Sequence, residues 1–185
     1  MKLTLLRHGE TEENLNHIIQ GQSAGHLSEL GKKQVEKVAD ELKSRHFDVI
    51  YSSDLARCVD TAEPIHKIFP KTPLIYSKAI REVSFGKFEG RHTHFIKLAR
   101  LGTMLNLKVP GGENWHDLKR RVIPFLNELY SKYPGGDILI ISHGGPIRVM
   151  ISLLHKSLDK SPHALIIPNC STWDLEMDQP IEFEK

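Results

Sequence analysis

Two histidines of this chain each follow a short apolar run and precede a glycine, a combination that can support phosphate chemistry. His8 comes after Leu3–Leu6 and one arginine, and His143 follows Ile138–Ile141 and one serine. A neutral imidazole can attack phosphorus and hold the phosphoryl group covalently, which divides one difficult displacement into two easier ones. Because Arg7 stands beside His8, and a guanidinium group binds phosphate oxygens in pairs, we expect one phosphate pocket built from both ends of the chain.

A second arginine, Arg57, follows Asp54 by three residues at the expected start of a helix. Together with Arg7 it could clamp the phosphate oxygens, and a helix N-terminus adds a favourable potential for an anion. The plainer alternative is that Arg57 pairs with Asp54 or Asp60 on a solvated helix face, because ion pairs at this spacing are common.

His143 and Gly144 are predicted to close the pocket from the other end of the chain. The imidazole would bind the phosphate and stabilise charge on the transferring group, and the Gly144 amide would be a further donor. The alternative is that each of the two histidines only bonds a carbonyl group at a strand end, and that the glycines only give the turn its conformational freedom.

Phosphoryl transfer also requires a proton for the leaving oxygen and, later, a base for the attacking water. A carboxyl group serves both purposes when a phosphate dianion beside it favours its protonated form. From the residues alone, four glutamates remain possible in this role: Glu10, Glu82, Glu89 and Glu113.

These residues must be positioned by elements that alternate along the chain between short β-rich runs and longer helical patterns. Strands are predicted at Lys2–Leu6, Asp48–Ser52, Pro73–Ser77, Asp137–Ser142, Ala164–Ile167 and Thr172–Met177. Most of these runs are continuously apolar, as is typical of strands buried on both faces of a mostly parallel sheet. Since ligands bind beyond the carboxyl ends of such strands, the loops that begin at residues 7, 52 and 143 are expected along one edge.

Four amphipathic patterns predict helices between and after these strands. Their apolar faces carry Val35, Val38, Ala39 and Leu42; Leu55, Cys58, Ala62 and Ile65; Trp115, Leu118, Val122, Phe125 and Leu129; and Ile147, Met150, Ile151 and Leu154. Asp54 can cap the second helix, and Pro64 should bend or end it. Pro124 interrupts the third pattern, and Pro146 suits the first turn of the fourth helix. The alternation predicts an α/β fold, a single three-layer αβα domain over residues 1–185 with a mostly parallel sheet.

Substrate choice is expected to reside in the segment 91–115, between the turn-rich stretch 81–90 and the third helix. Its apolar residues Phe95, Leu98 and Leu101 either line a lid over the pocket or form the buried face of a helix. The basic run Lys119–Arg121 is predicted to lie on a solvated helix face.

Composition restricts the class of partner. Lys plus Arg total 25 and Asp plus Glu total 23, so the net charge of +2 argues against bulk binding of nucleic acid or of an anionic membrane. No run reaches the roughly 18 apolar residues of a membrane span, and the start lacks the length of a secretory signal, so a cytoplasmic location is expected. Cys58 and Cys170 are expected to stay reduced. The eleven histidines match no metal-site spacing, so neither a metal nor another cofactor is expected. The oligomeric state is expected to be a monomer or a homodimer.

In its ordered set of motifs the chain resembles the histidine phosphatase superfamily, in its phosphoglycerate mutase-like branch with the RHG signature. The matching motifs cover nearly the whole length: LRHGET with Asn14 downstream, Gln20-Gly21, YSSDLAR with Thr61-Ala62, Glu82 with Phe85-Gly86 and Glu89-Gly90, Pro110-Gly111-Gly112-Glu113, Ser142-His143-Gly144, and Asn169-Cys170-Ser171. One three-letter match would be weak evidence, but this ordered set is specific.

The resemblance implies a role for each matching residue. His8 would be the phosphorylated nucleophile, Glu82 the proton donor and acceptor, and His143 a further catalytic residue of the phosphate pocket. The other residues that would bind the substrate are Arg7, Asn14, Gln20, Gly21, Arg57 and Gly144. The implied activity is the metal-independent hydrolysis of a small phosphomonoester.

Two departures from the mutases of this family favour a phosphatase. The stretch from Glu82 to Gly86 replaces their Glu-Arg-His-Tyr-Gly, and their longer insertion before the second histidine is missing. The remaining alternatives are a phosphoglycerate-type mutase and a non-catalytic module that binds phosphorylated ligands, which would need the arginines but neither the nucleophile nor the proton donor. A sugar phosphate, phosphoglycerate, alpha-ribazole phosphate or a phosphoamino acid would each suit the pocket.

Overall fold

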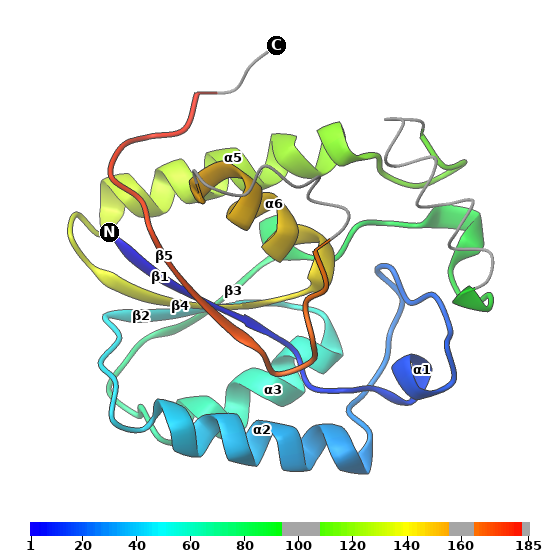
Figure 1. The fold of residues 1–185 in the computed structure, drawn as a ribbon, viewed down its shortest axis with the longest axis horizontal. Helices are drawn as coiled ribbons and strands as arrows, with labels where there is room; N and C mark the ends of the chain where they lie inside the picture. Colours follow the sequence, from blue (N-terminus) through cyan, green and yellow to red (C-terminus); the bar gives the residue numbers. More distant parts are fainter. Residues whose placement is uncertain (94–107, 156–164, 183–185) are drawn as a thin grey trace.

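The computed structural model describes residues 1–93, 108–155 and 165–182, which form a central sheet with helices on both faces (Figure 1). The five strands are β1 (Lys2–Arg7), β2 (Val49–Ser53), β3 (Leu74–Ser77), β4 (Asp137–Ser142) and β5 (Thr172–Glu176). Their order across the sheet is β3-β2-β4-β1-β5. The first four strands are parallel to their neighbours, and only β5 runs antiparallel, against β1. The prediction of a mostly parallel sheet is confirmed.

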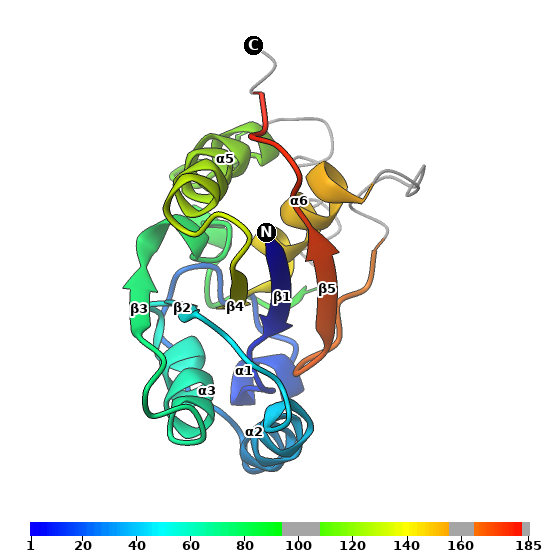
Figure 2. The same cartoon turned by 90° about the vertical axis from the view of Figure 1, so that its left-hand side faces the viewer.

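The helices form an outer layer on each face of the sheet. They are α1 (Glu12–Leu15), α2 (Glu29–Leu42), α3 (Ala56–His66), α5 (Trp115–Lys132) and α6 (Gly144–Leu154), with short 3-10 turns η1 (Lys78–Ile80) and η2 (Gly86–Phe88). Helices α2 and α3 cover one face, and α5 and α6 cover the other, as the two views of the ribbon agree (Figures 1 and 2). This arrangement is the predicted three-layer α/β architecture. No helix of the described segments has both the length and the apolar character needed to cross a bilayer.

Alternate residues of the central strands enter two separate cores. Leu5 and Ile140 pack in the cluster on the α5 and α6 side, whereas Leu6 and Ile141 pack in the cluster on the α2 and α3 side. The interior positions of β1, β2 and β4 are mostly apolar because both faces of these strands are buried, at about 1.5–3 kcal/mol for each large side chain removed from water. The rigid sheet thereby holds the loops at its edge.

One predicted strand is wrong in its described part. Residues 165–167 form no strand, and Ile166 is 80 % exposed whereas Ile167 is 1 % exposed. The carbonyl groups of this stretch are used by side chains instead of a neighbouring strand. Arg148 Nε donates a hydrogen bond to the Leu165 carbonyl group, and Arg7 Nη1 donates one to the Ile167 carbonyl group. The apolar stretch 165–167 is therefore a segment without strand pairing, and hydrogen bonds from two arginine side chains hold it in place.

The predicted cap of α3 is also wrong. Leu55 occupies the N-cap position, and no side chain caps the helix. The Asp54 carboxylate instead forms a two-pronged ion pair with Arg81, with both N–O distances at 2.6 Å. Pro64 lies inside α3, which ends two residues later at His66. Pro64 was predicted to bend or end the helix, and the helix continues past it for two residues.

The remaining predictions for the helices have mixed outcomes. The apolar faces of α2, α3, α5 and α6 are buried as predicted, apart from the half-buried Trp115 and Leu154. Pro124 lies inside α5 on its exposed side. The expectations for Phe95, Leu98 and Leu101 concern residues outside the described segments.

Candidate active site

The strand ends that carry the two histidines lie next to each other, because β1 and β4 are parallel neighbours in the sheet. Arg7 is opposite Ser142 in their register, and the His8 amide donates a hydrogen bond to the Ser142 carbonyl group at 3.0 Å. The rings of His8 and His143 consequently have their centroids 5.1 Å apart, at an angle of 60°. Residues from the two ends of the chain thus meet in one place.

A cavity of about 230 Å³ opens at this edge of the sheet. Its lining includes eight of the residues predicted for the site: Arg7, His8, Asn14, Gln20, Gly21, Arg57, Glu82 and Gly144. The ninth, His143, is completely buried and does not belong to the lining.

His8 is held as a neutral ring. It is 2 % exposed, and its Nδ1 lies 2.7 Å from the carbonyl oxygen of Gly9. Because a carbonyl oxygen only accepts, Nδ1 carries the proton and Nε2 has the free lone pair. Burial lowers the pKa of His8 well below its usual value, and the positive charges of Arg7 and Arg57 lower this pKa further. The ring can therefore act as a nucleophile at neutral pH.

Arg57 extends from the first turn of α3 into the site and is 1 % exposed. Its Nη2 donates to the Gly21 carbonyl group at 2.7 Å, its Nη1 to the Ser23 carbonyl group at 3.1 Å, and its Nε to His143 Nδ1 at 3.2 Å. The alternative in which this arginine pairs with a nearby aspartate on a solvated face is wrong. The buried guanidinium group is instead fixed in the wall of the cavity.

His143 lies behind Arg57, with both ring nitrogens engaged. Since Nδ1 accepts from Arg57, the proton is on Nε2, which donates to the Ser53 hydroxyl oxygen at 2.8 Å. Burial lowers the pKa of His143 well below its usual value, and the positive charge of Arg57 lowers it further. In this arrangement the neutral ring orients the guanidinium group that lines the cavity.

Arg7 is the last residue of β1 and one of its donors lacks a partner. The Nε atom is buried and has no hydrogen bond within the described segments, while Nη1 donates to the Ile167 carbonyl group. A buried donor without an acceptor costs free energy, so such groups are rare in folded proteins. An anion bound in the cavity would supply the missing acceptor.

The Glu82 carboxylate lies at the N-terminus of α6. The Gly145 amide donates to its two oxygens, at 3.0 and 3.3 Å, and the Val83 amide donates to Oε1 at 2.8 Å. The first amides of a helix have no intrahelical acceptor, so the Gly145 amide is available to bond this carboxyl group. A Cβ atom at position 145 would overlap Oε1, so the approach depends on glycine.

Glu82 is the only one of the four glutamates left open by the sequence that lines the cavity. The other three connect parts of the chain. Glu10 accepts from a serine hydroxyl, Glu89 accepts from two loop amides, and Glu113 pairs with an arginine. The tertiary structure therefore distinguishes carboxylates that the sequence alone left equivalent.

Three of the remaining predicted residues lie in α1 and in the loop that follows it. The Asn14 Oδ1 atom accepts a hydrogen bond from Asn169 Nδ2 at 3.2 Å. Gln20 Nε2 donates to a Glu13 carboxylate oxygen at 2.7 Å. Gly21 has a φ of 54°, a conformation that favours glycine, and its carbonyl group faces Arg57.

Eleven further residues of the lining were not predicted for the site, among them Glu13, His17, Phe85, Trp115 and Arg148. Arg148 had a usable signal, because it follows Gly144 by four residues and so lies one turn along the same face of α6. Trp115, which was predicted on the apolar face of its helix, packs against the core and lines the cavity as well.

Metal-binding clusters and a disulfide are both missing from what the structure describes. No group of three or more His, Cys, Asp or Glu side chains within 1–93, 108–155 and 165–182 could hold a metal ion. Cys58 and Cys170 are free thiols. Burial raises the pKa of each thiol to about 12, so both are protonated and poorly reactive.

The cavity combines a neutral buried imidazole, a cationic wall and a carboxylate. This combination is typical of enzymes that transfer phosphoryl groups. Residues 3–180 match the model of the histidine phosphatase superfamily (branch 1). The chain belongs to this superfamily.

Similar proteins carry both phosphatase and mutase names. The chain is 32 % identical to a putative phosphoserine phosphatase 2 of Hydrogenobacter thermophilus, over 83 % of this chain and 78 % of the relative. It is 30 % identical to a probable phosphoglycerate mutase GpmB of Cronobacter sakazakii, over 97 % and 86 %. A mycobacterial glucosyl-3-phosphoglycerate phosphatase, solved in complex with VO3, superposes with a TM-score of 0.82 at 29 % identity, covering 95 % of this chain and 92 % of that one.

Proposed function

We propose that the protein hydrolyses small phosphomonoesters through a phosphohistidine intermediate on His8, with Glu82 as proton donor and acceptor. The observation that carries the proposal is the hydrogen bond from His8 Nδ1 to the Gly9 carbonyl group, in a ring that lines the cavity. This bond leaves the lone pair on Nε2, and a neutral imidazole is the form that attacks phosphorus.

In the first step, Nε2 of His8 forms a bond to phosphorus while the bond from phosphorus to the ester oxygen breaks. Glu82, in its protonated form, gives its proton to the leaving oxygen, so the product departs as a neutral alcohol. Arg7 and Arg57 neutralise charge on the phosphoryl oxygens. His143 supports this step by holding Arg57 in the wall of the cavity.

In the second step, the Glu82 carboxylate takes a proton from a water molecule. The water oxygen bonds to phosphorus, the bond from phosphorus to His8 breaks, and inorganic phosphate leaves. Further contacts with the substrate are proposed for lining residues of α1, of the loop that follows it and of α6: Asn14, Gln20, Gly21 and Gly144.

The size of the cavity supports a small phosphorylated metabolite as the substrate. Its volume of about 230 Å³ is below the range of roughly 300–1,000 Å³ that is usual for sites binding drug-sized ligands. The names of the relatives, which include phosphoserine and glucosyl-3-phosphoglycerate phosphatases, are compatible with this class.

The first test compares His8→Ala with His46→Ala, an exposed histidine outside the lining. His8→Ala should lower kcat/KM by at least about a thousandfold, because it removes the nucleophile, and His46→Ala should leave it unchanged. Labelled substrate quenched in alkali should leave phosphate bound to the native protein but not to His8→Ala. Near-normal turnover by His8→Ala would contradict the covalent step, and binding without turnover in the native protein would indicate a module that only binds phosphorylated ligands.

A phosphoglycerate mutase is the second candidate, because one relative of that name matches 97 % of this chain. A mutase would return the phosphoryl group from His8 to another hydroxyl of the bound substrate, whereas a phosphatase passes it to water. Incubation with phosphoglycerate, followed by measurement of free phosphate and of the isomerised product, separates the two. Isomer in excess of phosphate would favour the mutase.

A further inference from the structure

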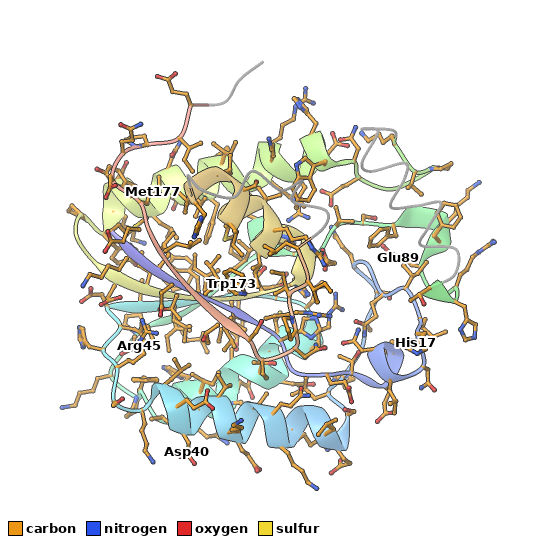
Figure 3. The ribbon with its side chains drawn as sticks, viewed as in Figure 1. His17, Asp40, Arg45, Glu89, Trp173 and Met177 are labelled. Carbon is orange, nitrogen blue, oxygen red and sulfur yellow. The ribbon has the colours of Figure 1, made fainter. Side chains whose placement is uncertain are left out.

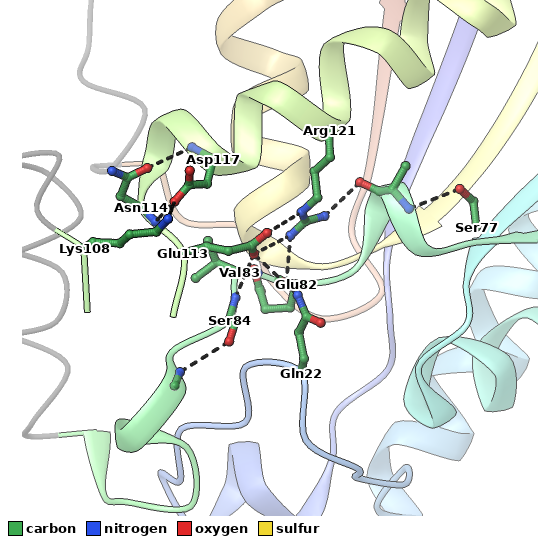
Figure 4. A network of polar contacts seen from close by, with 12 residues as sticks. Gln22, Ser77, Glu82, Val83, Ser84, Lys108, Glu113, Asn114, Asp117 and Arg121 are labelled. Carbon is green, nitrogen blue, oxygen red and sulfur yellow. Dashed lines mark hydrogen bonds and ion pairs between the residues drawn. The ribbon is translucent and has the colours of Figure 1, made fainter. Parts of the chain in front are cut away.

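A polar network lies behind Glu82 and connects helix α5 to the loop that carries this residue (Figure 4). We call it the Arg121 network; it consists of the side chains of Gln22, Glu113 and Arg121 and the backbone of residues 79–84. The Arg121 side chain is 18 % exposed and that of Glu113 is 22 % exposed. The prediction that Arg121 lies on a solvated face is therefore wrong, although neither side chain lines the cavity.

The Arg121 guanidinium group bonds the chain before and at Glu82. Its Nη1 donates to the Ala79 carbonyl group at 2.8 Å, and its Nη2 donates to the Glu82 carbonyl group at 2.9 Å. Its Nε and Nη2 also form a two-pronged ion pair with Glu113, with both N–O distances at 2.9 Å. The planar guanidinium group thus connects two backbone carbonyl groups and one carboxylate.

The other side of Glu82 is fixed by Glu113 and Gln22. The Ser84 amide donates to Glu113 Oε2 at 2.9 Å, and the Glu113 amide donates to the Ser84 carbonyl group at 2.8 Å. Gln22 Nε2 adds a bond to the Glu82 carbonyl group at 3.0 Å. The two backbones approach closely because residue 112 is glycine; a Cβ there would lie 2.6 Å from the Ser84 carbonyl oxygen.

The carboxyl group of Glu82 itself has few contacts that hold it. Within the described segments its hydrogen bonds are with the amides of Val83 and Gly145. Its position relative to His8 therefore depends on the backbone at residue 82 as well as on the Gly145 amide. A general acid must lie about 2.6–3.2 Å from the atom that receives its proton, and a misplacement of about 1 Å can cost about a hundredfold in rate.

We propose that Arg121 is a positioning residue for the proton donor: it fixes the backbone of residues 79–84 so that the Glu82 carboxyl group meets the leaving oxygen. The inference rests on the proposed role of Glu82. Lysine cannot replace the arginine in this task, because an ammonium group is a point charge without the planar fork that bonds Glu113 and two carbonyl groups together.

The test is a double-mutant cycle of Arg121→Lys and Glu82→Gln, read as kcat/KM for an alkyl phosphate and for 4-nitrophenyl phosphate. This parameter reports on the steps through formation of the phosphohistidine, in which only the poor alkoxide leaving group depends on a donated proton. Arg121→Lys should lower kcat/KM for the alkyl phosphate about tenfold to a hundredfold, and that for the nitrophenyl ester less than about threefold. In the Glu82→Gln background it should have no further effect.

The control is Arg45→Lys, which disturbs a comparable pair. Arg45 bonds the Asp174 carboxylate through two nitrogens, at 2.9 and 3.2 Å, on the far side of the molecule from the cavity residue His17 (Figure 3). It should leave kcat/KM unchanged for both substrates.

The other outcomes each contradict a different statement. Equal losses for both substrates, no loss at all, or losses of Arg121→Lys and Glu82→Gln that multiply would show that Arg121 does not act through Glu82. If Glu82→Gln itself leaves turnover of the alkyl phosphate intact, the proposed function fails in its proton donor and the inference fails with it. Should Arg121→Lys not fold, Glu113→Gln replaces it in the cycle, with the same expected and contrary results.

Discussion

Charge balance at the cavity favours an anion. The lining contains three arginines (Arg7, Arg57 and Arg148) and two glutamates (Glu13 and Glu82). His8 adds no charge, because burial and the neighbouring arginines lower its pKa well below the usual value. A phosphate monoester would therefore find more positive than negative charge in the wall, together with the unpaired Arg7 Nε donor. Arg7 and Arg57, which would bind the anion, also lower the pKa of His8.

Substitution of Gly145 by alanine tests the residue-scale geometry of Glu82. A Cβ at position 145 would overlap Glu82 Oε1, so Gly145→Ala should displace the carboxyl group. We expect kcat/KM for an alkyl phosphate to fall by about a hundredfold or more, because general acid catalysis is lost. The loss for 4-nitrophenyl phosphate should be much smaller.

The matched variant is Gly144→Ala. Its Cβ would lie 3.1 Å from Arg148 Nη1, the far end of a long side chain, and 3.8 Å from Glu82 Oε2. It should therefore not discriminate between the two leaving groups. Equal selectivity of the two alanine variants would show that the Gly145 contact does not fix the carboxyl group.

Among the elements, strand ends and helix starts deliver the site together. β1 ends at Arg7, α3 begins one residue before Arg57, and α6 begins one residue before Gly145. Parallel strands point their carboxyl ends the same way, so each following helix directs its N-terminus toward the cavity.

Helix α5 contains one residue that weakens it. Pro124 is exposed and lies in the interior of the helix, where it cannot donate a hydrogen bond to the Arg120 carbonyl group. Pro124→Ala should raise the free energy of unfolding by about 1–3 kcal/mol without loss of packing. Urea unfolding followed by circular dichroism would measure this.

Pro64→Ala provides the comparison for that variant. Pro64 lies two residues before the end of α3, so the hydrogen bond that it cannot donate and its ring clash disturb only the last turns of the helix. Its gain should be smaller than that of Pro124→Ala. A destabilised Pro124→Ala variant would mean that the proline shapes the helix for its packing against the sheet.

In the whole molecule, two neutral histidines are buried together beside several arginines. His8 and His143 are both almost inaccessible, and each has its pKa lowered well below 6.5, first by burial. The unfolded chain takes up protons on both residues near pH 6.5, whereas the folded protein does so only at a much lower pH. The unfolded state then binds more protons, so the free energy of unfolding falls as the pH decreases below about 6.5.

The predicted dependence amounts to as much as about 1.4 kcal/mol per pH unit for each histidine. Urea unfolding at about pH 7, 6 and 5 would measure it, above the range in which carboxylates such as Asp54 titrate. His8→Ala should reduce the slope, whereas His46→Ala should not. Stability that is constant or rises on acidification over this range would contradict the neutral burial of the two rings.

Much of this arrangement was accessible from the sequence because it depends on near neighbours. Short β-rich runs, most of them continuously apolar, identified β1, β2, β3, β4 and β5, and the spacing of apolar residues identified the buried faces of the long helices. Failures occurred where a side chain from elsewhere took over a local role. The stretch 165–167 has the composition of a strand, yet its carbonyl groups bond Arg7 and Arg148. Asp54 has the position of a cap, yet it pairs with Arg81.

The sequence by itself determined that two strands each deliver a histidine, and that arginines accompany them. The tertiary structure decided which glutamate faces the cavity, that His143 stands behind Arg57, and that Arg121 fastens the loop of Glu82. These relations join residues far apart along the chain; the Glu82 and Gly145 contact spans 63 positions. Such contacts arise only when crossovers bring the strand ends to one edge of the sheet, and no local pattern of residue types carries that information.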